Sequence, residues 1–246
     1  MSQVILGKNG VYYKVMSDRD LIGRFIAQKG EYEPELQQIT SLILKGKVGL
    51  VLDIGANIGA FAMPVAKLNA HVNVVCFEAQ SAVFKNLKEG VAMNGLEQRV
   101  KLIHCGLADR NGNVRMSIPD YSKEANVGAF SLDADVRAND YEVTTQGGTE
   151  LFTLYPLDRF GLNQVQMIKM DVEGMELQVL QGAVETLKRN HFPPIIFEAW
   201  TWKAFYQKRR EAILEFLDQL GYEVIALGQN NLAQHSSRKD HLQIVR

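Results

Sequence analysis

The run VLDIGANIG at Val51–Gly59 is the feature that most constrains how this chain can fold. The apolar residues up to Ile54 have the length and composition of a buried strand, and the glycines that follow let the backbone turn sharply and approach a ligand closely. A helix after such a turn presents unpaired N–H groups. The next predicted strand ends in Glu78, where an acid can accept hydrogen bonds from two ribose hydroxyls. The sequence therefore predicts a nucleoside-binding strand–loop–helix unit.

The spacing of this loop favours one kind of nucleoside ligand. It has the form G-x-x-x-G and lacks the middle glycine of G-x-G-x-x-G, which a pyrophosphate needs to lie against the backbone. Asp53, at the end of the strand, would repel a pyrophosphate and attract a sulfonium or an α-amino group. S-adenosylmethionine carries both cations and no phosphate, so we expect it to be the ligand.

After residue 49, short apolar segments alternate with segments of helical periodicity, which predicts βαβ units and a parallel sheet. The expected strands are Leu50–Ile54, Val72–Phe77, Val100–His104, Gln166–Met170, Ile195–Phe197, Tyr222–Leu227 and Leu242–Val245. The expected helices are Asn57–Leu68, Ala82–Met93, Met175–Arg189 and Lys203–Leu220. We expect the last two strands to form an antiparallel return across a polar stretch, Gln229–Asp240.

The N-terminal residues have a different pattern. Apolar runs on either side of Asn9-Gly10 predict a β-hairpin, and helical periodicity follows at Asp18–Gln28 and Pro34–Leu44. We expect residues 1–48 to form a hairpin and helical cap, and residues 49–246 to form the main domain of a single folding unit. A chain of 246 residues is long enough for one α/β domain with a sizeable core.

One segment does not follow the alternation. Pro119–Glu150 is polar, has little periodicity and contains the charge-dense run DADVRAND at Asp133–Asp140. A loop of that length inside a compact domain is usually functional or mobile. Two interpretations stay open, a lid on the substrate side and a solvated insertion.

Several motifs together resemble the FkbM family of S-adenosylmethionine-dependent methyltransferases. They are DIGANIG at Asp53–Gly59, CFEA at Cys76–Ala79, IKMDVEGMELQVLQGA at Ile168–Ala183 and GEYEPE at Gly30–Glu35. Ala79 stands where the family commonly has proline, but the preceding acid is kept.

This resemblance extends from about Gly30 to Glu198 and carries expectations for fold and function. It implies an α/β, Rossmann-like class I methyltransferase fold with a mostly parallel seven-stranded sheet, an antiparallel C-terminal strand and helices on both faces. It also implies O-methylation of a hydroxyl on a sugar, a polyketide or another small metabolite.

Acids at the ends of later strands are the candidates for catalysis. Asp171, Glu173 and Glu198 should converge beyond the carboxyl ends of the parallel strands, near the transferable methyl. An alcohol is a poor nucleophile, and a positioned base accelerates such a transfer by about 10²–10⁴-fold. We expect Asp171 or Glu173 to be the base, with Glu198 as the third candidate.

The remaining candidates follow from the same placement at strand ends. Asp109 could accept from the adenine amine, although it also belongs to an ordinary turn with Gly112. Lys169 lies in an apolar strand and could pair with a carboxylate. The predicted cofactor-binding residues are Asp53, Gly55, Ala56, Asn57, Gly59, Glu78, Ala79, Ala108, Asp109 and Asp171. Asp171 and Glu198 could also hold Mg²⁺, but two acids alone are thin support and we assign no metal.

Composition limits the partners. A net charge of -1 gives no global attraction to nucleic acids or anionic membranes, and no run of about 18 apolar residues could span a bilayer. We therefore expect a cytoplasmic protein that acts on a small-molecule or glycan acceptor, and the oligomeric state is not predicted. Two alternatives stay open, an NAD-dependent Rossmann oxidoreductase and a non-catalytic nucleoside-binding protein.

Overall fold

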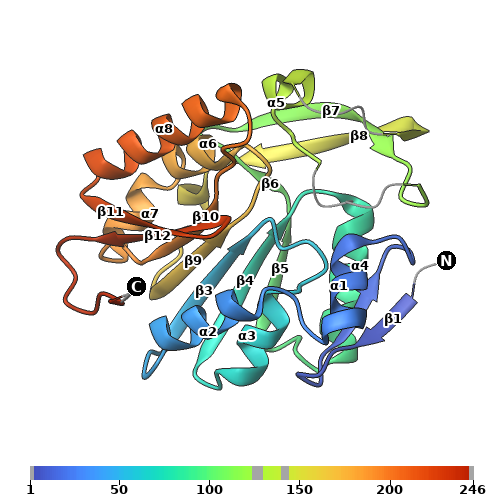
Figure 1. Ribbon diagram of the computed structural model, residues 1–246, viewed down its shortest axis with the longest axis horizontal. Helices are drawn as coiled ribbons and strands as arrows, with labels where there is room; N and C mark the ends of the chain where they lie inside the picture. Colours follow the sequence, from blue (N-terminus) through green and yellow to red (C-terminus); the bar gives the residue numbers. More distant parts are fainter. Residues whose placement is uncertain (1–2, 124–129, 140–143, 244–246) are drawn as a thin grey trace.

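The computed structural model describes residues 3–123, 130–139 and 144–243, and its centre is a seven-stranded sheet (Figure 1). The strand order is β11-β12-β10-β9-β3-β4-β5. The strands are β3 (Gly49–Ile54), β4 (Val72–Glu78), β5 (Val100–His104), β9 (Val165–Met170), β10 (Ile195–Glu198), β11 (Tyr222–Leu227) and β12 (Asn230–His235). Pairing is parallel from β5 through β10, and β12 is antiparallel to both of its neighbours. The expected Rossmann-like class I methyltransferase fold is confirmed.

Helices cover both faces of this sheet, because its central strands are apolar on both sides. On one face, Val51 and Cys76 pack against α2 (Pro34–Ile43), α3 (Ala62–Leu68) and α4 (Ser81–Met93). On the other, Leu52 and Phe77 pack against α6 (Glu176–Gln181), α7 (Val184–Arg189) and α8 (Ala204–Gln219). Figure 1 shows these two groups on opposite sides of the strands. The sheet therefore separates two hydrophobic clusters.

The N-terminal hairpin is confirmed and is joined closely to the main sheet's helices. It consists of β1 (Gln3–Leu6) and β2 (Tyr12–Val15), and α1 (Leu21–Lys29) follows it. Asn94, which follows α4, accepts from Tyr12 N–H at 2.9 Å and donates to its carbonyl at 2.7 Å. Tyr13 and Val15 are fully buried in the same cluster as α4. The hairpin thus packs as part of one core.

The helix predicted from Asn57 begins later, at Ala62. Pro64 explains the difference: in the observed helix it is the third residue, where the missing N–H would have had no partner. A start at Asn57 would have placed the proline in the helix interior, where it removes a hydrogen bond. Residues 55–61 are therefore free to form a loop over the sheet.

The predicted helix Met175–Arg189 is two helices, because a neighbouring segment supplies the caps at the break. Asp158 lies in the short 3₁₀ helix η1 (Leu157–Phe160), and its carboxylate accepts from Glu185 N–H at 3.1 Å and Thr186 N–H at 2.6 Å. Its own N–H donates to the Gly182 carbonyl at 3.0 Å. These bonds replace those that a continuous helix would make across Gly182.

The final strand was predicted wrongly at Leu242–Val245. It lies instead at Asn230–His235, inside the polar stretch expected to be a turn. Leu242 N–H donates to the Gln234 side chain at 2.6 Å, and the Gln234 amide donates to the Leu242 carbonyl at 3.1 Å. A side-chain amide therefore satisfies the backbone that looked like a strand, and residues 244 and 245 lie outside the described residues.

The segment Pro119–Glu150 is bounded by a second sheet and is not one continuous loop. Its strand order is β6-β8-β7, with β6 (Gly106–Leu107), β7 (Gly112–Pro119) and β8 (Thr145–Tyr155), and the helix α5 (Ala134–Asn139) lies between β7 and β8 in the chain. Residues 124–129 and 140–143 of this segment lie outside the described residues. Figure 1 shows α5 beside the end of α8.

Gly182 provides a test of the helix break. A Cβ there would lie 2.0 Å from the Ala108 carbonyl oxygen and 3.1 Å from Pro156 Cα, so backbone would have to move. We expect Gly182→Ala to lower the free energy of unfolding by more than about 2 kcal/mol. The matched control is Gly112→Ala, where a Cβ meets nothing within 4 Å and the change should stay within about 0.5 kcal/mol. Urea unfolding followed by circular dichroism measures both, and equal stabilities would contradict this account.

Candidate active site

A cavity of about 350 Å³ lies at the carboxyl ends of β3, β4, β9 and β10. Open parallel sheets bind ligands at this edge, and small-molecule sites span about 300–1,000 Å³. The strand ends contribute Gly55, Glu78, Asp171 and Glu198 to its lining. The cavity is therefore large enough for a small molecule and has carboxylates on several sides.

The loop between β3 and α3 contains three residues with positive φ, Gly55, Asn57 and Gly59. Gly55 has φ 79°, and a Cβ there would lie 1.8 Å from the Asp171 carbonyl oxygen, so only glycine lets these two strand ends approach. Asn57 has φ 51°, which asparagine tolerates better than most residues. Its N–H donates to Glu78 Oε2 at 3.0 Å. The loop and the end of β4 are thus held together.

Glu78 is buried but keeps capacity to accept further hydrogen bonds. Its Oε1 accepts from Gln80 N–H at 2.8 Å, and Ala79 N–H is a further backbone donor, so the carboxylate still has lone-pair capacity for a ligand. Burial raises the pKa of Glu78 to about 7, and the N–H groups of Gln80, Asn57 and Ala79 oppose that rise. Its geometry suits a carboxylate that accepts from ligand hydroxyls.

Lys169 lies between two carboxylates, as the sequence suggested it could. Its Nζ is 3.7 Å from Asp53 Oδ1 on the neighbouring strand and 3.4 Å from Asp171 Oδ2. Burial by itself lowers the pKa of Lys169, but Asp171 and Asp53 together raise it above its ordinary value. Burial raises the pKa of Asp53 to about 6, and Lys169 opposes the rise. The lysine therefore compensates acids at the bottom of the site and stays charged.

Glu173 and Glu198 face the cavity with less compensation. Glu173 Oε2 is buried without a hydrogen-bond partner, and burial, followed by the charges of Asp171 and Glu198, raises the pKa of Glu173 well above its usual range. Burial, with Asp171 next, raises the pKa of Glu198 to about 8. A carboxyl with a raised pKa is a stronger base once it is ionised, so both side chains are candidates to accept a proton from a substrate.

Glu176 looks similar in sequence but has a local partner. Its Oε1 accepts from Val172 N–H at 3.3 Å and Gly174 N–H at 3.2 Å, and the residue begins α6. It therefore holds the turn that carries Glu173.

The structure brings together most of the predicted residues, but not all. Those that line the cavity are Gly55, Asn57, Glu78, Ala79, Asp171, Glu173 and Glu198. Those that do not are Asp53, Ala56, Gly59, Ala108 and Asp109. Asp53 is fully buried beside Lys169, and Asp109 lies 3.7 Å from Arg110 at the surface. The roles of both groups stay predictions.

Other lining residues were not individually predicted from the sequence. Tyr32 belongs to the GEYEPE stretch, whose resemblance to the family was the available signal, and Glu33 beside it accepts from Asn230 at 3.1 Å. Phe130 and Leu132 come from the unpatterned segment before α5. Nothing in the local sequence indicated Gln229, which lines the cavity from the turn before β12.

Comparison with known proteins decides the family. A family model described as the methyltransferase FkbM domain matches residues 53–224. The chain belongs to the FkbM methyltransferase family. It is therefore an S-adenosylmethionine-dependent methyltransferase, and the predicted cofactor and enzyme class are confirmed.

Similar proteins have related names. The 2-O-methyltransferase NoeI of Sinorhizobium fredii is 26% identical over 201 residues, which cover 77% of this chain and 78% of that protein. The methyltransferase sdnD of Sordaria araneosa is 26% identical over 189 residues, which cover 67% of this chain and 71% of that protein. Among solved structures, a putative caffeoyl-CoA O-methyltransferase from Staphylococcus aureus aligns with a TM-score of 0.49 and 15% identity, over 88% of this chain and 91% of that one.

No group of three or more histidine, cysteine, aspartate or glutamate side chains within the described ranges is arranged to hold a metal ion. In the same residues, no helix has both the length and the apolar character that crossing a membrane requires.

The raised pKa of Glu198 makes stability depend on pH. Its folded-state value of about 8 lies above the ordinary 4.5, so its stabilising contribution is full below about pH 4.5 and is lost as pH rises through 8. We expect Glu198→Gln to reduce the fall in unfolding free energy between pH 5 and pH 8.5 by at least about 1 kcal/mol. Urea titrations at both pH values measure this. Glu211→Gln, at an exposed position on α8, is the control and should leave the fall unchanged.

Proposed function

We propose that this methyltransferase transfers a methyl group to a hydroxyl of a sugar or another small metabolite. The observation that carries the proposal is Glu173, which lines the cavity and whose Oε2 is buried without a hydrogen-bond partner. A hydroxyl needs such a base, because it is a weak nucleophile until its proton is removed. The name of the relative NoeI, a 2-O-methyltransferase, supports an oxygen acceptor.

The residues on the β3–β4 side fit the cofactor. Glu78 would accept from the ribose hydroxyls with its free lone pairs, beside the backbone of Gly55 and Asn57. Ala79 and the backbone of β6, Gly106–Leu107, would border the adenine ring of the cofactor. We propose that Asp53, Ala56, Gly59, Ala108 and Asp109 act from outside the cavity lining, by shaping this loop and the adjoining strand ends.

The acids on the β9–β10 side would act on the acceptor. S-adenosylmethionine supplies the methyl group when it is bound and leaves as the thioether. Glu173 would accept the proton of the acceptor hydroxyl as the oxygen–carbon bond forms, and its strong affinity for protons keeps that proton. Asp171 would stay ionised through its ion pair with Lys169. Glu198 would orient the hydroxyl of the acceptor.

The acceptor would lie against apolar parts of the cavity wall. Trp200, Phe130 and Leu132 contribute to the lining, and small-molecule sites are mostly apolar with a few polar groups. Residues 1–48 would close the site as a cap on the domain 49–246, because Leu21, Ile22 and Tyr32 also line it. These walls suit a small molecule or the end of a glycan.

Binding of S-adenosylhomocysteine tests the cofactor side. Glu78→Gln keeps the shape of the side chain but removes the charged acceptor, so we expect affinity to fall roughly 10- to 100-fold. Isothermal titration calorimetry at pH 8 measures it. Glu97→Gln, at an exposed position after α4, is the matched control. Unchanged affinity in the Glu78 variant would rule out the ribose contact.

Turnover separates the candidate bases. With labelled methyl donor and a panel of small saccharides and alcohols, we expect Glu173→Gln to lower kcat by about 10²–10⁴-fold while S-adenosylhomocysteine affinity is kept. Asp171→Asn should weaken both, because Asp171 also pairs with Lys169. A loss of kcat only in the Asp171 variant, with turnover kept in the Glu173 variant, would assign the base to Asp171.

A further inference from the structure

The turn that carries Glu173 has an unusual backbone. Glu173 has φ 54° and Gly174 has φ 98°, so two successive residues adopt left-handed conformations. For a glutamate this costs roughly 1–2 kcal/mol, and neighbouring contacts must hold it. Glu176 binds the turn's N–H groups, but it leaves the Gly174 carbonyl for another donor.

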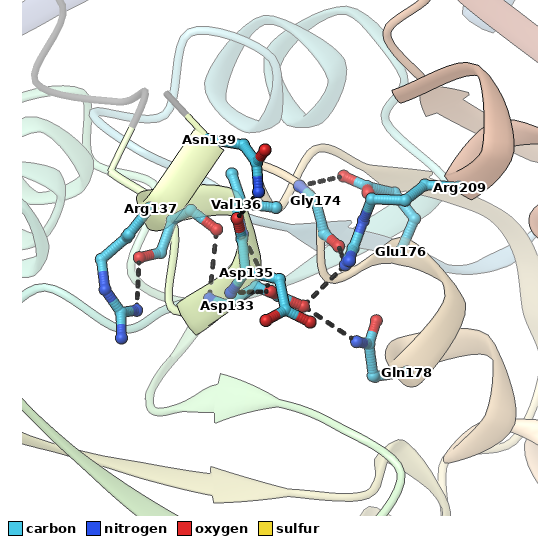
Figure 2. Close-up of polar contacts among 10 residues, drawn as sticks. Asp133, Asp135, Val136, Arg137, Asn139, Gly174, Glu176, Gln178 and Arg209 are labelled. Carbon is cyan, nitrogen blue, oxygen red and sulfur yellow. Dashed lines mark hydrogen bonds and ion pairs between the residues drawn. The ribbon is translucent and has the colours of Figure 1, made fainter. Parts of the chain in front are cut away.

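That donor is Arg209, which reaches the turn from α8 (Figure 2). Its Nη2 donates to the Gly174 carbonyl at 2.6 Å and to Asp133 Oδ2 at 2.6 Å. A partly buried guanidinium is stable only with a paired charge, so Asp133 keeps Arg209 in place. Gln178 of α6 donates to the same Asp133 oxygen at 3.1 Å.

Asp133 also orders the helix that packs on this turn. Its Oδ1 accepts from Asp135 N–H at 2.8 Å and Val136 N–H at 3.1 Å, which caps the start of α5. Val136 then packs on Gly174, since a Cβ on Gly174 would lie 2.6 Å from Val136 Cγ2. The charged run at Asp133–Asp140 thus supplies two contacts to the Glu173 turn. Asp133 pairs with Arg209, and Val136 packs on Gly174.

We propose that Arg209, anchored by Asp133, is a positioning residue that fixes the Glu173 turn and so keeps the Glu173 carboxyl buried at the cavity. The proposal rests on the proposed role of Glu173. It adds a polar clamp from α8 and α5, two elements distant in sequence from the turn. Arg209 acts through Gly174 and does not line the cavity.

The titration of the Glu173 carboxyl distinguishes positioning from a simple charge effect. Carbon-13 NMR of protein labelled at glutamate carboxyls follows it, and loss of the signal in Glu173→Gln assigns it. If Arg209 acted only through its positive charge, its removal would raise the pKa of Glu173. If Arg209 instead holds the turn closed, its removal exposes the carboxyl to water and lowers the pKa. Asp171, Glu198, Glu176 and Lys169 also face this carboxyl and are unchanged in the comparison.

We expect Arg209→Ala to lower the Glu173 titration midpoint by at least about one unit. Asp133→Asn should also lower the Glu173 midpoint, because asparagine no longer forms an ion pair with the Arg209 guanidinium. Asparagine still caps α5, so the helix itself is kept. Asp133→Asn is the second variant in case Arg209→Ala fails to fold. Lys208→Ala, exposed on the same helix, is the matched control and should leave the midpoint in place. A midpoint that rises or stays constant in a folded Arg209 or Asp133 variant overturns the proposal.

Cofactor binding separates this result from the proposed function. S-adenosylhomocysteine affinity should stay within about threefold in both variants, because the clamp does not touch Glu78 or its loop. Loss of that affinity would overturn a role confined to Glu173. If Glu173→Gln retains turnover, the proposed base is wrong, while the titration results still decide whether Arg209 positions the turn.

Discussion

The close approach of two strand ends governs the rest of this structure. Asp171 N–H donates to the Ile54 carbonyl at 2.9 Å, and its own carbonyl lies where any side chain on Gly55 would have to be. Because the strands meet this closely, the loop that holds Glu78 and the turn that holds Glu173 share one edge of the cavity. Lys169 reduces the electrostatic repulsion between the acids that meet here, since it places a cation between Asp53 and Asp171.

The sequence predicted the parts of the fold whose pattern is local. The buried strands and the β3–α3 turn follow from apolar runs and glycines, and Glu78 follows from its place at a strand end. The break at Gly182 did not, because the groups that end the helix belong to Asp158, far away in the chain. Likewise, the exchange of hydrogen bonds between Gln234 and Leu242 is a tertiary contact that no local pattern announces.

The candidate site divides in the same way. Asp171, Glu173 and Glu198 were found from strand ends alone, and the structure places all three around the cavity. Burial separated residues that the sequence had grouped: Asp53 is enclosed beside Lys169, while Asp109 faces outward toward Arg110. Phe130 and Leu132 were missed because their segment has no periodicity, and the pairing of Asp133 with Arg209 beside them joins residues far apart in the chain.

The charges of the site make the state of its acids depend on what is bound. Burial and the charges of neighbouring acids raise the pKa values of Glu173 and Glu198, which favours their protonated forms. A cation placed beside them acts in the opposite direction and favours ionisation. The ionised forms of these carboxyls, which can accept a proton, are therefore favoured by a cationic ligand beside them. Such coupling needs carboxyls that are buried yet uncompensated, which distinguishes Glu173 from Asp171 with its lysine and from Glu176 with its backbone partners.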